Sequence, residues 1–278
     1  MAEKMRHGRQ PARAVAVTFD DGYVDNLRNA TPLLETAGIS ATVYIPSGFV
    51  GTEQEFWWDS LETRVLFPGR LPETLRLNFQ GVLKAWNLGA TAVYEESDFY
   101  RHKHWDVFQS DSPTPRHALY RELCALFQPL PRSAQDAALA ELRSQWEPAR
   151  RRPDDRRCVS EAELRQLAST DGIEIGAHTV SHRRLGDADF EAQTQELVTS
   201  KTTLETWLGR PVRSLAFPYG NYTAETVAAA RSAGFESAVT TEERYLRRAD
   251  DPLEIPRVFV RDWNGEEFDR HLTQWQRD

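Results

Sequence analysis

"AVAVTFDDGYVDNLRNATPLLETAGISATVYIP", residues 14–46, is the stretch that decides the fold. Residues 14–18 are an apolar, β-branched run of the kind found in buried strands. Residues 24–38 carry apolar side chains at helical spacing and end at Gly38, and residues 40–46 are a second β-branched run. The stretch therefore predicts the βαβ unit of a parallel sheet.

The same alternation returns after residue 158. Ser160 and Glu163 form a capping box at the start of a helix over 161–170, and Gly172 ends it. Further strands are predicted over 173–178, 214–218, 235–240 and 254–260, with helices over 189–209, 223–234 and 265–276. We expect an α/β protein with six or seven strands.

Residues 50–157 interrupt this alternation. The segment is far longer than an ordinary βα loop, and it contains amphipathic runs such as "RHALYRELCALF" and "DAALAELRSQW". We interpret it as a largely helical insertion, either a lid or an interface, within a single domain that spans residues 1–278.

The composition argues against several classes of partner. Lys and Arg number 34 against 42 Asp and Glu, and this net charge of −8 gives no support for binding nucleic acid or an anionic membrane. The chain has no apolar signal-like run before the first strand and no stretch approaching 18 apolar residues. Cys124 and Cys158 lack the spacing of a disulfide framework or a zinc knuckle. We expect a cytoplasmic protein without a membrane span, and no signal indicates its oligomeric state.

Polar side chains follow three of the predicted strands. "TFDDG" comes after the first strand, "GAHTVSH" lies at the end of the strand over 173–178, and "AFPYG" lies at the end of the strand over 214–218. Because the carboxyl ends of parallel strands meet at one edge of the sheet, we expect these segments to lie together.

His178 and His182 have the i, i+4 spacing that places two imidazoles on one face of a helical turn. A catalytic metal ion needs at least a third protein ligand, which one carboxylate of Asp20 and Asp21 can supply while the other takes a proton from water. By itself, the acid pair is typical of a turn or a helix cap. The histidine pair by itself is typical of residues on the protein surface. Their joint occurrence favours a divalent metal site, and these ligands suit zinc, cobalt, nickel or iron.

The segments "TFDDGY", "HTVSH" and "AFPYG" resemble the first three motifs of the polysaccharide deacetylase superfamily, also called the NodB-homology or carbohydrate esterase family 4 superfamily. The resemblance covers residues 13–48 and 158–278. It implies a distorted, incomplete (β/α) barrel and a hydrolase that removes N-acetyl groups from amino sugars with a divalent metal, most often zinc.

The resemblance also implies individual roles. It makes Asp20 the general base and leaves three metal ligands, Asp21, His178 and His182. Thr179 braces the metal-binding loop through its hydroxyl or is a plain turn residue. The backbone N–H of Tyr219 helps to bind the oxyanion.

This sequence departs from the family pattern at two places. Phe217 stands where many members have an arginine that orients the base, and Arg257, in "IPRVFV", either substitutes for it or makes a salt bridge that holds the fold. The late "L-x-H" histidine that serves as general acid is absent. We assign a catalytic role to Asp262 after the last predicted strand, and we expect His271 to lie on the surface.

Substrate binding is assigned to residues of the motifs, the insertion and the C-terminal segment: Tyr23, Trp58, Asp59, Pro218 and Trp263. For the tryptophans of the insertion, core packing is the alternative. An N-acetylated sugar is the expected substrate. The alternatives are a metal-dependent hydrolase of a non-sugar amide or imide on the same scaffold, and a binding module without activity.

Overall fold

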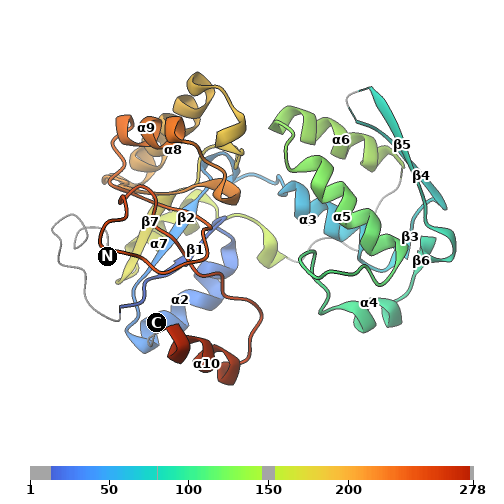
Figure 1. Ribbon diagram of the computed structural model, residues 1–278, viewed down its shortest axis with the longest axis horizontal. Coiled ribbons are helices and arrows are strands. Elements are labelled where there is room, and N and C mark those ends of the chain that lie inside the picture. The colour runs from blue at the N-terminus through green and yellow to red at the C-terminus, as the bar shows by residue number, and fades with distance from the viewer. Residues whose placement is uncertain (1–13, 80, 146–153, 276–278) are drawn as a thin grey trace. The chain divides into compact units, whose positions relative to one another are not determined.

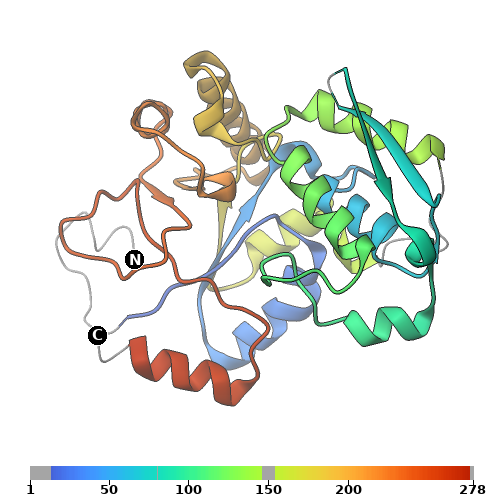
Figure 2. The same ribbon diagram turned by 45° about the vertical axis from the view of Figure 1, so that its right-hand side comes forward.

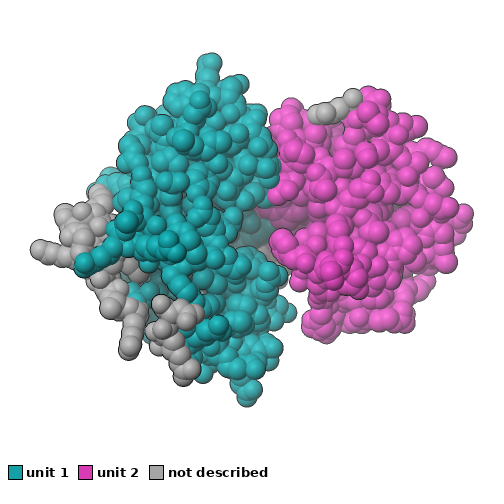
Figure 3. All heavy atoms as spheres, viewed as in Figure 1, with its two compact units in different colours: residues 1–52, 158–278 teal, residues 53–157 magenta. Residues whose placement is uncertain are grey.

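The protein divides into two compact units (Figure 3). The computed structural model describes residues 14–79, 81–145 and 154–275. One unit contains residues 1–52 and 158–278, and the other contains residues 53–157. In the described part of the chain, no helix is both long and apolar enough to cross a membrane.

A five-stranded sheet forms the centre of the first unit (Figures 1 and 2). The strands lie in the order β1 (Val17–Phe19), β2 (Ala41–Ile45), β7 (Ile173–Ala177), β8 (Ser214–Ala216) and β9 (Ser237–Val239). Every neighbouring pair is parallel. The predicted α/β class with a parallel sheet is therefore confirmed.

Helices connect these strands, and in the view of Figure 1 α8 and α9 lie toward the top of the unit and α2 toward the bottom. The connecting segments are η1 (Asn26–Ala30), α2 (Thr31–Ala37), α7 (Glu161–Ser169), α8 (Phe190–Leu208) and α9 (Ala224–Ser232). The predicted capping box is present, because the Ser160 hydroxyl accepts the Glu163 N–H at 3.2 Å and the Glu163 carboxylate accepts the Ser160 N–H at 2.9 Å. A further helix, α10, comprises Gly265–Trp275.

The predicted strand over 254–260 is wrong. Only Ile255 pairs with the described sheet, through hydrogen bonds that join it to Ala238 of β9 and to Thr240 just after β9. The ladder does not continue, because the Arg257 N–H donates to the carbonyl of Glu242 while the Arg257 side chain donates to that of Thr240, and Phe259 and Val260 are exposed. The described sheet therefore has five strands and a one-residue bridge instead of six or seven strands.

The sheet curls into a half-barrel, as the hydrogen bonds of Arg257 demonstrate. β1 and β9 are its two edge strands, yet this guanidinium donates to the hydroxyl of Thr18 in β1 at 3.1 Å and to the carbonyl of Thr240, just after β9, at 2.9 Å. In a flat sheet, four strand spacings would separate the edges by about 19 Å, more than one side chain spans. The incomplete barrel implied by the motifs is confirmed.

The second unit is built mainly from four helices. They are α3 (Trp57–Val65), α4 (Glu96–His102), α5 (Pro115–Phe127) and α6 (Arg132–Gln145). Two antiparallel strand pairs, not predicted from the sequence, accompany them: β3 (Gly69–Arg70) with β6 (Val93–Tyr94), and β4 (Thr74–Phe79) with β5 (Val82–Asn87). The core side chains include Leu61, Leu75, Leu77, Leu119, Leu123 and Leu142.

A buried arginine connects several segments of this second unit through hydrogen bonds. Arg116 of α5 is fully buried, and its guanidinium donates to five backbone carbonyls. The acceptors are Val65, Phe67, Gly69, Thr91 and Ala92. Because these carbonyls lie at or just after the end of α3 and within or next to the β3–β6 pair, one side chain joins the helices to the small sheet.

Candidate active site

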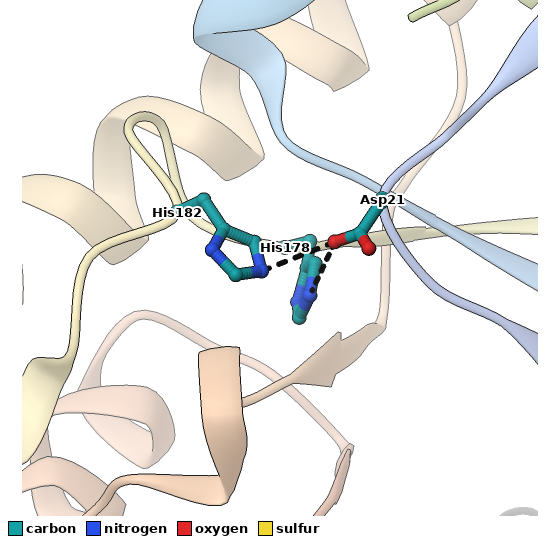
Figure 4. A group of neighbouring side chains, drawn as sticks. All are labelled: Asp21, His178 and His182. Carbon is teal, nitrogen blue, oxygen red and sulfur yellow. Dashed lines mark ion pairs between the residues drawn. The ribbon is translucent and has the colours of Figure 1, made fainter. Parts of the chain in front are cut away.

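Three loops at the carboxyl ends of β1, β7 and β8 supply the chemically active side chains. Asp20 and Asp21 follow β1, His178 and His182 follow β7, and Tyr219 lies in the single turn η6 (Pro218–Gly220) after β8. The sequence predicts that these segments meet, and the parallel register of the sheet brings Asp21, His178 and His182 into one cluster (Figure 4).

The cluster has the dimensions of a metal site. One ligand atom from each of Asp21, His178 and His182 lies within 4.8 Å of the others. Asp21 Oδ1 is 3.1 Å from His182 Nε2 and 3.5 Å from His178 Nε2, as the dashed lines in Figure 4 mark. Both histidines are buried.

The orientation of His178 is fixed by a hydrogen bond. Its Nδ1 lies 2.8 Å from the carbonyl oxygen of Ala216 in β8. A carbonyl only accepts, so Nδ1 carries the proton and the lone pair of the neutral ring is on Nε2, which faces Asp21. This is the arrangement of a metal-binding histidine whose second nitrogen is held by the backbone.

The charges of the cluster favour ligation. Burial alone would raise the pKa of Asp21, but the adjacent His182 and His178 outweigh it and hold this pKa well below its usual range. Burial lowers the pKa of His182 against the attraction of Asp21, which favours the neutral ring. Burial also acts to lower the pKa of His178, but its bond to Asp21 and the charges of Asp20 and Asp21 outweigh it, so this pKa is raised. A metal ion binds an ionised carboxylate and neutral imidazoles, so its binding would displace the proton that Asp21 favours on His178.

A divalent transition metal fits these residues. Asp21 Oδ1 is buried, and no donor among the described residues makes a hydrogen bond to it, although two ring nitrogens lie close by. A cation between the three atoms would satisfy this oxygen and both lone pairs. Two imidazoles and one carboxylate are also the ligand set of several catalytic zinc sites, where a further position is left for water or substrate.

The backbone of the site is strained at four positions. Among the described residues, the non-glycine residues with positive φ are Asp21, Thr179, His182 and Tyr219, with values of 69°, 63°, 56° and 59°. Each such residue costs on the order of 1–3 kcal/mol and persists only where surrounding contacts impose it. All four lie in the loops after β1, β7 and β8, which indicates that the loops are held for function.

The loop over 178–182 is braced from several directions. The Thr179 hydroxyl accepts the His182 N–H at 3.0 Å, which is the bracing expected from the motif. Backbone bonds from Ser47 and Gly48 reach the carbonyls of Thr179 and Val180.

Glu196 of α8 also contacts this loop, and the sequence analysis missed it. Its carboxylate accepts the N–H groups of Val180 and Ser181 and the Ser181 hydroxyl. The signal that could have indicated Glu196 was an acid next to Leu197, which is buried, on the face of the helix that packs inward.

Asp20 and Arg257 form a two-pronged ion pair. Arg257 Nη1 donates to Asp20 Oδ1 at 2.7 Å and Nη2 donates to Oδ2 at 2.8 Å. The pKa of Arg257 is raised above its usual value: its burial opposes the shift, and the bonds to Asp20 outweigh it. Because Arg257 also joins both sheet edges, one side chain makes the contact with Asp20 and a contact that holds the fold. Phe217, which stands where the family resemblance implied an arginine, is fully buried and stacks on Tyr222 at 4.9 Å.

The remaining predicted site residues lie in varied environments. Tyr23 bridges to Cys158 through the backbone, and Pro218 is buried beside Tyr219, whose ring meets the edge of His182. Trp263 stacks on His271 of α10 at 4.0 Å. His271 is half-buried rather than fully on the surface, and Asp262 is exposed. The roles of Asp262 in catalysis and of Trp263 in substrate binding stay predictions.

Two predicted residues belong to the insertion unit. Trp58 stacks on Phe56 at 4.5 Å, as core packing would require, and Asp59 is buried. Their assignment to substrate binding also stays a prediction.

Comparison with known proteins gives a consistent family. The model of the polysaccharide deacetylase family matches residues 7–75 and 144–238, more than half of the chain. YxkH of Bacillus subtilis (strain 168), a protein named as a polysaccharide deacetylase, is 28% identical over 102 residues. That match covers 37% of this chain and 36% of YxkH, so it spans about a third of the curated relative.

Three solved structures share the fold. The deacetylase PplD of Streptococcus pyogenes in complex with acetate has a TM-score of 0.54 and 16% identity, over 98% of this chain and 76% of that one. The BpsB deacetylase domain of Bordetella bronchiseptica has a TM-score of 0.52 and 17% identity, over 93% and 76%. IcaB of Ammonifex degensii has a TM-score of 0.51 and 16% identity, over 97% and 75%.

Proposed function

Because the chain belongs to the polysaccharide deacetylase family, we propose that it is a metal-dependent hydrolase that removes an N-acetyl group from an amino sugar. The observation that carries the proposal is the presence of a candidate metal cluster beside an oriented carboxylate at the carboxyl ends of β1 and β7. Asp21, His178 and His182 converge on a volume suited to one cation, and Asp20 is held beside them by Arg257.

The two adjacent acids divide the work. Asp21 ligates the metal together with the two histidines, and a divalent ion bound there supplies a Lewis acid that polarises the acetyl carbonyl and acidifies water. Asp20, oriented by its two bonds from Arg257, takes the proton of the attacking water. Repulsion between the two carboxylates is offset because each faces its own cation.

The rest of the reaction needs an oxyanion donor and an acid. We assign the donor to the backbone N–H of Tyr219, whose left-handed conformation lies in the turn beside His182. Addition of water oxygen to the carbonyl carbon is followed by cleavage of the C–N bond, which releases acetate and an amine once the nitrogen gains a proton. Asp262 is the proposed source of that proton.

We infer zinc as the metal, with cobalt, nickel and iron as the other metals that the ligands suit. A cytoplasmic location is part of the proposal. It favours a nucleotide-linked or lipid-linked amino sugar, or a glycosylated metabolite, over finished cell-wall polymer as the substrate.

Acetate release and metal binding by Asp20→Asn test the proposal. We expect acetate release to fall by about 10²–10⁴ while the affinity for Zn²⁺ stays at the wild-type level, because Asp20 acts on the proton and Asp21 on the metal. Wild-type rates in this variant with zinc or cobalt added would refute the base assignment. N-acetylglucosamine oligomers, nucleotide sugars and cyclic imides are assayed in parallel. Turnover of the imides alone would favour the non-sugar alternative suggested by Phe217.

A further inference from the structure

Glu196 makes a dense set of hydrogen bonds with the loop that carries both histidines. One carboxylate oxygen accepts the N–H of Val180 at 2.8 Å and the N–H of Ser181 at 2.9 Å. The other oxygen accepts the Ser181 hydroxyl at 2.6 Å. These three bonds fall on two of the three residues between His178 and His182, and none of them involves a ligand atom.

The loop needs such a contact because its backbone is strained. Thr179 and His182, which flank the two bonded residues, both have left-handed backbone conformations. Consecutive N–H groups that point the same way are a concave anion site, and a carboxylate placed there stabilises that conformation. The side chain of Glu196 therefore matches the conformation that turns both imidazoles toward Asp21.

Helix α8 gives Glu196 a rigid base. Its neighbours on the same face of the helix, Gln193, Leu197 and Ser200, are all buried, and α8 packs against β7 and the turn η2 (Ser47–Phe49). The same η2 turn binds the loop through the backbone of Ser47 and Gly48. The loop is thus held between η2, which bonds to it through backbone N–H groups, and Glu196, which bonds to it through a charged side chain.

We propose that Glu196 is a positioning residue that sets the divalent-metal affinity of the site by holding residues 178–182 in their ligating conformation. The inference rests on the proposed function, since it requires that Asp21, His178 and His182 bind a metal. Outer partners that orient metal ligands typically contribute 10–100-fold to metal affinity.

Metal titration of the full chain tests the inference. Zn²⁺ affinity is measured by competition with a chromogenic chelator, and Co²⁺ binding by its visible absorption, which reports ligand geometry independently of activity. Glu196→Ala is expected to bind both metals 10–100-fold more weakly and to change the Co²⁺ spectrum. Glu196→Gln keeps an oxygen for the two N–H groups and is expected to recover most of the affinity.

Glu205 offers a matched control on the same helix. It accepts the Val212 N–H at 2.9 Å and pairs with Lys201 at 2.9 Å, so Glu205→Ala also removes an acid bonded to backbone, away from the loop. We expect its metal affinity to equal that of the wild type. Ser181→Ala deletes only the 2.6 Å bond and is expected to lower the affinity by about threefold, which keeps the test available if Glu196→Ala fails to fold.

The outcomes separate the two proposals. Wild-type affinity in Glu196→Ala, or an equal loss in Glu205→Ala, would overturn the positioning role and leave the proposed function in place. Failure of the wild-type protein itself to bind Zn²⁺ or Co²⁺ would overturn the proposed function and this inference with it.

Discussion

Replacement of Arg257 by glutamine separates the orientation of Asp20 from metal binding. The guanidinium makes two bonds to this carboxylate, at 2.7 and 2.8 Å, while 18% of the Arg257 and 29% of the Asp20 side chain is exposed. Hydrogen bonds to charged groups contribute about 1.5–3 kcal/mol each, and partial exposure favours the lower end, so about 3 kcal/mol of orienting interaction is lost. That energy corresponds to a rate reduction of roughly 100-fold.

The assay is acetate release at saturating Zn²⁺, with metal occupancy and thermal unfolding measured on the same samples. Arg257→Gln is expected to lose roughly 100-fold in kcat while it keeps wild-type metal occupancy, because Arg257 contacts no metal ligand. Arg257→Lys restores the charge without the two-pronged geometry and is expected to be intermediate.

Arg244→Gln is the matched control. Arg244 also bonds to two carboxylates, Glu242 and Asp250, and neither is a proposed catalytic or metal-binding residue, so its loss is expected to leave kcat unchanged. If Arg257→Gln keeps wild-type kcat at full metal occupancy, orientation of Asp20 by Arg257 is refuted.

Three further predictions concern the loop and the insertion. Gly48→Ala would place a Cβ 2.6 Å from the carbonyl oxygen of Val180, so we expect a loss of about 1–3 kcal/mol in unfolding free energy and weaker Zn²⁺ binding, measured by thermal unfolding and chelator competition. Arg116→Gln leaves buried carbonyls without donors and is expected to lower the unfolding free energy by at least about 3 kcal/mol, whereas a change within about 0.5 kcal/mol would contradict this role. Burial lowers the pKa of His117 from 6.5 to about 4 in the folded protein. Between these two pH values the unfolded chain binds a proton that the folded chain does not, so the free energy of unfolding falls as the pH drops from 6.5 to 4, by at most about 3 kcal/mol. Calorimetry across that range should show a weaker pH dependence in His117→Gln, and equal slopes would argue against it.

Local patterns were sufficient for much of the fold. The Ser160 capping box and the left-handed Gly38 and Gly209 are set by residues close in sequence, so the ends of these helices were predicted correctly. The strand over 254–260 was predicted wrongly, because the β-branched residues of this segment favoured a strand more than Pro256 argued against one.

The sequence by itself was enough to predict the candidate metal-binding cluster. His178 and His182 at i, i+4 and the acid pair of Asp20 and Asp21 both occur at predicted strand ends, where a parallel sheet must gather them, and the family resemblance singled out Asp21 from the pair. Parallel pairing alone is enough to bring these strand ends together, so the cluster did not depend on details of side-chain packing.

Only the tertiary structure decided which groups hold the candidate site residues in place. Arg257 lies 237 residues from Asp20 and reaches it because the sheet curls, and Glu196 meets Val180 and Ser181 because α8 packs against β7. The angle at which a sheet closes and the depth at which a helix packs arise from the whole core, and no local pattern of residues encodes either of them.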